Sequence, residues 1–69
     1  MDVYQRKAAV VDLIIRKVKL MESGKSMETA ELYETILLNG FNKKLLNEIL
    51  NTLSELNMIT FNKELIKRL

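Results

Sequence analysis

Residues 42–51 of this chain are rich in asparagine and lysine. An asparagine amide can pair with two atoms of the adenine edge at once, and a lysine ammonium can reach guanine acceptors or phosphate oxygens. Asn47 and Asn51 are four positions apart, which places them on one side of a helix. We therefore interpret these two asparagines as candidates for contacts with base edges.

The lysines around them are candidates for phosphate contacts. Lys43 and Lys44 would lie at the positive end of a helix dipole, where a cation is disfavoured by roughly 0.3–1 kcal/mol. A residue that disfavours the local structure and brings no evident gain in stability often serves the function of the protein. The complete candidate set for nucleic-acid binding is Asn42, Lys43, Lys44, Asn47, Asn51, Lys63, Lys67 and Arg68.

A second interpretation assigns these side chains no ligand at all. Lysine and asparagine are ordinary on an exposed helix face, and six asparagines can reflect an AT-rich coding sequence. Glu28, Glu31 and Glu34 would lie near a bound duplex and repel its phosphates. With a net charge of only +2, a DNA-binding chain of this kind should bind weakly as a monomer and need a dimer.

The composition argues against catalysis and metal binding. Histidine and cysteine are both absent, which removes the commonest general base, the commonest metal ligand and any disulfide. The three glutamates fall at helical spacing, as on a solvated face; they could hold Ca²⁺ loosely but lack a dedicated loop. We expect no catalytic residue, no metal site and no cofactor.

The length of 69 residues predicts one small domain over residues 1–69. Charged residues interrupt every apolar run well before the roughly 20 residues that a membrane span needs. Asp12 and Arg16 likewise interrupt any signal-peptide core near the N-terminus. We expect a cytoplasmic protein without membrane contact, nucleoid-associated if DNA is its ligand.

Three residues that favour left-handed backbone follow apolar-periodic stretches: Gly24, Gly40 and Asn57. Each predicts the end of a helix. The expected helices run from about Asp2 to Met21, from Glu28 to Leu38 and from Asn42 to Leu56. The second and third are joined by only residues 39–41, which suits a helix-turn-helix.

The first expected helix carries two apolar stripes. One of them, Val11, Ile14, Ile15, Val18 and Met21, should face the core. The other is formed by Val10, Leu13 and Leu20. Either the remaining helices cover it in part, or it is a dimer or docking interface.

The second and third helices have simpler patterns. Ser26 or Thr29 could cap the second helix, and Asn42 is a good N-cap for the third. The residues expected to face inward are Leu32, Ile36 and Leu37 on the second helix, and Leu46, Ile49, Leu50 and Leu53 on the third.

After Asn57 the apolar period changes from 3.6 to 2, which predicts a short hairpin with its turn at residues 62–64. The alternative is a fourth helix over residues 63–69, because Lys, Glu and Leu favour helices. Residues 25–27 could add a first strand. The expected fold is mainly α with a small β-hairpin.

This pattern resembles a winged helix-turn-helix. Phe41 is followed after five, eight, nine and twelve residues by Leu46, Ile49, Leu50 and Leu53, and Met58-Ile59-Thr60 begins the wing. The resemblance covers nearly the whole chain and extends to the C-terminal domain of minichromosome maintenance helicases and to small archaeal, viral and plasmid-borne regulators. It implies a three-helix domain that binds double-stranded DNA through residues 42–56 and regulates transcription or replication. The alternative that it implies is an accessory module that binds a protein partner.

Overall fold

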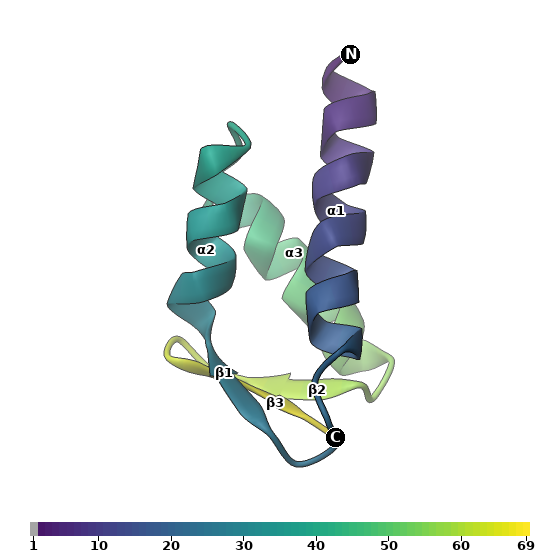
Figure 1. Cartoon of the computed structure of the whole chain (residues 1–69), viewed down its shortest axis with the longest axis vertical. Helices are drawn as coiled ribbons and strands as arrows, with labels where there is room; N and C mark the ends of the chain where they lie inside the picture. The colour runs from purple at the N-terminus through teal and green to yellow at the C-terminus, as the bar shows by residue number, and fades with distance from the viewer. Residues whose placement is uncertain (1) are drawn as a thin grey trace.

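The computed structural model describes residues 2–69 as three helices and a small antiparallel sheet, with most residues helical (Figure 1). The sheet lies across one end of the helices, and the two termini lie towards opposite ends of the long axis. The elements are α1 (Val3–Lys19), β1 (Ser26–Glu28), α2 (Thr29–Leu38), α3 (Lys43–Glu55), β2 (Ile59–Phe61) and β3 (Leu65–Arg68). No helix within residues 2–69 combines the length and the apolar content that crossing a membrane requires.

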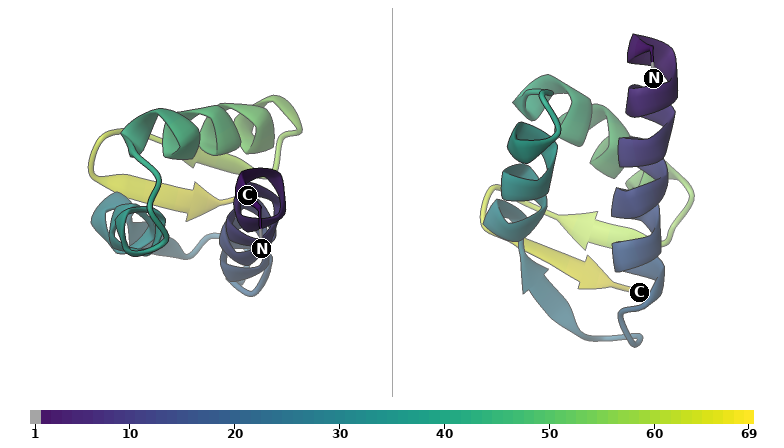
Figure 2. Two further views of the ribbon diagram at one scale, coloured as in Figure 1. Left: turned by 90° about the horizontal axis from the view of Figure 1, so that it is seen from above. Right: turned by 45° about the horizontal axis from the view of Figure 1, so that its top comes forward.

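Helix α1 begins with a capping box. The Asp2 carboxylate accepts from the backbone N–H of Gln5 at 2.8 Å, and the Gln5 side-chain oxygen accepts from the backbone N–H of Asp2 at 3.3 Å. Residues 3–9 are all exposed, and the first turns project beyond the other helices (Figure 2). They account for much of the elongated shape, 36 × 19 × 18 Å.

Two of the three expected helix stops close their helices directly. Gly40 and Asn57 have φ values of +82° and +60°. After α2, the N–H of Phe41 donates to the carbonyl of Ile36 and that of Gly40 to Leu37, both at 3.0 Å, which is a Schellman motif. Gly24 also has positive φ, but it lies in the loop beyond the end of α1, because that helix already stops at Lys19.

The sheet has the order β1-β3-β2, with Met27 and Phe61 both opposite Ile66. The predicted hairpin is confirmed, and the alternative of a fourth helix over residues 63–69 is wrong. Strand β3 is the central strand, so its backbone pairs with β1 on one side and with β2 on the other. The side chain of Asn62 accepts from the N–H groups of Glu64 and Leu65 at 2.8 and 2.9 Å, which shapes the turn.

The core fills the space between the helices and the sheet. Its residues show that the predicted inward faces of α1 and α2 were partly wrong. Val10 is only 3% exposed and packs with Ile14 and Val18, so it cannot belong to a surface interface. The buried line of α1 is Val10, Ile14 and Val18, whereas Val11 lies at its edge. Leu37, expected inside, is 50% exposed.

On α3 the predicted inward-facing residues are confirmed, and one further residue is buried. The three leucines and one isoleucine expected inside are buried, and Leu45 is buried with them. The buried set of the whole chain is Val10, Ile14, Val18, Leu32, Ile36, Leu45, Leu46, Ile49, Leu50, Leu53, Ile59 and Ile66.

Candidate nucleic-acid interface

The first turn of α3 is capped by a side chain, and its outer side faces solvent. Asn42 is the N-cap, as predicted, and its side-chain oxygen accepts from the backbone N–H of Lys44 at 3.1 Å. Because one side of the helix is packed into the core, its other side is fixed towards solvent. Lys43, Lys44, Asn47 and Asn51 are all exposed there.

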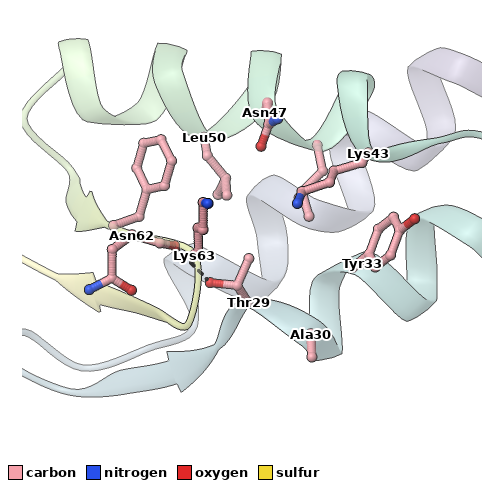
Figure 3. A pocket seen from close by; sticks show the side chains of 10 residues that line it. Thr29, Ala30, Tyr33, Lys43, Asn47, Leu50, Asn62 and Lys63 are labelled. Atoms are coloured by element: carbon pink, nitrogen blue, oxygen red, sulfur yellow. Dashed lines mark hydrogen bonds between the residues drawn. The ribbon is translucent and has the colours of Figure 1, made fainter.

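A cavity of about 390 Å³ lies between α3, the start of α2 and the β2–β3 turn (Figure 3). Lys43 and Asn47 reach it from α3, and Lys63 reaches it from the turn. In Figure 3 the amino groups of both lysines extend into the space below Asn47. Three of the predicted binding residues, separated by up to 20 positions in the sequence, are thus brought together.

The β2–β3 turn is held at this place by the first residue of α2. The hydroxyl of Thr29 donates to the backbone carbonyl of Asn62 at 3.2 Å, and the backbone N–H of Thr29 donates to the carbonyl of Glu64 at 2.9 Å. These two bonds flank Lys63 in the sequence and keep its backbone beside α2. Thr29 therefore secures the turn, and the expected capping of α2 by Ser26 or Thr29 is wrong: Glu28 is the N-cap residue and makes no side-chain cap bond.

A second depression, on the α1 side of α3, adds a cation that the sequence interpretation did not include. Lys44 and Asn42 line it together with Lys7 of α1 and with Glu48. The dipeptide Arg6-Lys7 is visible in the sequence, but only the packing of α1 beside α3 brings Lys7 to Lys44. The start of α3 therefore has cations on both flanks, from α1 and from the β2–β3 turn.

Three of the predicted residues do not join this group. Asn51 is exposed on α3 but does not line the cavity. Lys67 lies on the outer face of the sheet, where it pairs in register with Ser26 and Thr60. Arg68 is half-buried, and its guanidinium donates to the carbonyl of Met58 at 3.0 Å, so it holds β2 and is not a surface cation.

The charge around the start of α3 is mixed but locally positive. Within residues 2–69 the single ion pair is on α1, between Arg16 Nε and Asp12 Oδ2 at 2.9 Å. Lys43, Lys44 and Lys63 consequently have no carboxylate within salt-bridge distance. Acidic residues line neighbouring depressions: Glu48 lies in the one that Lys44 lines, and Glu28 and Glu64 lie in another that Lys63 lines. The described residues contain no cluster of three acidic side chains that could hold a metal ion.

Two of the three residues expected at an interface on α1 remain on the surface. Leu13 is 39% exposed and Leu20 is 85% exposed. They are seven positions apart and therefore lie on one side of the helix axis. Val10 is removed from this group by its burial.

Comparisons with protein-family models, with curated proteins and with solved structures give no match to this chain.

Proposed function

We propose that this protein is a winged helix-turn-helix that binds double-stranded DNA and regulates transcription or replication. The observation that carries the proposal is the convergence of Lys43 and Asn47 of α3 with Lys63 of the β2–β3 turn around one exposed cavity. The order helix, strand, helix, helix, hairpin and the sheet order β1-β3-β2 support it, since the hairpin then stands beside α3 as a wing.

In this proposal α3 enters the major groove. Its 13 residues span about 20 Å, and the major groove is about 12 Å wide and admits a helix. Asn47 and Asn51 face the base edges. Lys43, Lys44 and Lys63 contact phosphates on either side of the groove, and Lys7 extends this contact along α1.

A second copy strengthens the binding. The net charge is +2, so one chain neutralises few phosphates, whereas a two-fold dimer doubles the contacts. Leu13 of α1 and its C-cap residue Leu20 are exposed apolar side chains that could form a dimer interface.

The test is a double charge reversal, Lys43→Glu with Lys44→Glu, measured by fluorescence anisotropy on a mixed-sequence duplex. We expect duplex binding to be lost. The melting temperature should stay nearly unchanged, because both side chains are exposed and an acidic residue suits the first turn of a helix.

The matched control is Lys19→Glu with Lys25→Glu, which makes the same change in net charge at the end of α1 and in the loop after it. This control should retain most of the binding. Equal loss in both variants would mean that only net charge matters, and retained binding in Lys43→Glu/Lys44→Glu would contradict the proposed face.

The second candidate function is a protein-interaction module, an accessory subunit of a replication or transcription complex. It is favoured by the exposure of Leu20 and Leu13 on one side of α1. Leu13→Glu should leave the circular dichroism spectrum intact and change the molar mass in solution measured by light scattering.

Leu38→Glu on α2 is the control for that experiment, since Leu38 is also an exposed leucine, 87% against 39% for Leu13, but lies on another helix. An unchanged mass in Leu13→Glu, or an equal change in Leu38→Glu, would count against an interface on α1.

A further inference from the structure

The cavity between α3, α2 and the β2–β3 turn has an apolar floor, which DNA phosphates alone do not explain. Phe61 of β2 forms the accessible part of this floor, whereas Leu46 and Leu50 of α3 line it from the core and are almost fully buried. Ala30 and Tyr33 of α2 close one side. The volume of about 390 Å³ falls within the range of about 300–1,000 Å³ that is usual for small-molecule sites.

The rim of the same cavity is cationic. Lys43 and Lys63 extend their amino groups into it from two different elements, and no carboxylate lines it. The remaining polar side chains, those of Asn47, Thr29, Asn62 and Tyr33, carry no charge. An apolar floor below two ammonium groups is complementary to a molecule with an apolar body and one acidic group.

We propose that this cavity binds a small organic anion, an aromatic carboxylate or sulfonate, with its ring against the partly exposed Phe61 and its acidic group between Lys43 and Lys63. A neutral aromatic compound would leave the lysines without a counter-charge. An inorganic anion would leave the partly exposed side chains of Phe61 and Tyr33 uncovered. Only the combined chemistry satisfies both parts of the cavity.

One consequence rests on the proposed DNA binding. The ligand occupies the two lysines that we assign to phosphate contacts, so ligand and duplex compete. A small organic anion would thus release the protein from DNA.

The probe for the site is naphthalene-1-sulfonate, titrated into the ¹⁵N-labelled full chain without DNA and followed by amide chemical shifts. We expect the shifts to concentrate at Thr29, Asn47 and Lys63. Lys43→Gln with Lys63→Gln should weaken the binding roughly tenfold, at roughly two- to fivefold for each exposed charge. Lys19→Gln with Lys25→Gln should leave it unchanged.

Two further ligands and one further variant complete the test. Naphthalene-1-methanol, which is neutral, and inorganic sulfate, which lacks a ring, should each bind much more weakly. Asn47→Phe retains both lysines but fills the cavity from α3 and should also reduce binding. Equal binding of either control ligand, or shifts centred elsewhere, would overturn the proposal.

The competition is measured afterwards by adding the probe to a protein–duplex mixture. Displacement of the duplex supports the shared lysines, and simultaneous binding overturns them. If the probe binds but the duplex never does, the ligand site stands and the proposed DNA binding fails.

Discussion

Asn62 determines the shape of the β2–β3 turn, which carries Lys63. Its side-chain oxygen accepts from two backbone N–H groups, and its own carbonyl accepts from the hydroxyl of Thr29. The position of Lys63 at the cavity therefore depends on hydrogen bonds made by its neighbour Asn62.

Asn62→Ala removes both side-chain hydrogen bonds and should lower the free energy of unfolding by about 1–2 kcal/mol, the usual cost of losing a cap-like acceptor. In a domain of this size each kcal/mol lowers the melting temperature by roughly 4–8 °C, so thermal denaturation will resolve the change.

Asn62→Asp is the matched variant, because a carboxylate keeps the acceptor, and it should lose much less. Asn47→Ala provides the background, since Asn47 is an exposed asparagine on α3. An aspartate variant as unstable as the alanine variant would show that the acceptor is unimportant.

At the scale of elements, α1 consists of two parts with different support. Its second half contributes Val10, Ile14 and Val18 to the core, whereas residues 3–9 are exposed and have only the capping box to hold their start. Short helical segments without tertiary packing are marginal in water. The capping box should therefore matter locally.

Asp2→Ala should increase the hydrogen-exchange rates of amides in the first two turns of α1 while changing the global melting temperature by only a few degrees at most. The reason is that opening these turns exposes almost no core surface. Exchange in α3 is the internal control. Equal acceleration across all helices would contradict the division of α1 into two parts.

The elements themselves were predictable because their signals are local. Asn42 caps α3 by its own side chain, Gly40 and Asn57 supply left-handed residues, and the change of period after Asn57 marks the hairpin. The errors arose where a face depends on another element. Whether Val10 or Val11 turns inward is decided by how α1 packs on the other helices, and this information is not contained in the periodicity of α1.

In the candidate site, too, local signals were predictable and contacts between elements were not. Lys43, Asn47 and Lys63 were predicted individually from charge and spacing, but their common cavity depends on the bonds from Thr29 to the β2–β3 turn. Lys7 was missed because it lies far from α3 in the sequence. Arg68 was included because its strand position left its direction open, and the fold turns it towards Met58.

At the scale of the whole molecule, cations from three parts of the chain flank the start of α3. Lys7 of α1 and Lys63 of the β2–β3 turn flank Lys43 and Lys44, which gives one chain four candidate phosphate contacts from three elements. Such contacts release condensed counterions, and the logarithm of the association constant then falls linearly with the logarithm of the salt concentration.

The salt dependence of duplex binding tests this arrangement most directly. Anisotropy titrations at several salt concentrations should give a slope of roughly −3 to −4 per bound chain, about −0.9 for each phosphate contact. Lys63→Gln should make the slope less steep by about one, and Lys19→Gln should not change it. A slope near zero, or no binding at low salt, would contradict DNA binding through the start of α3.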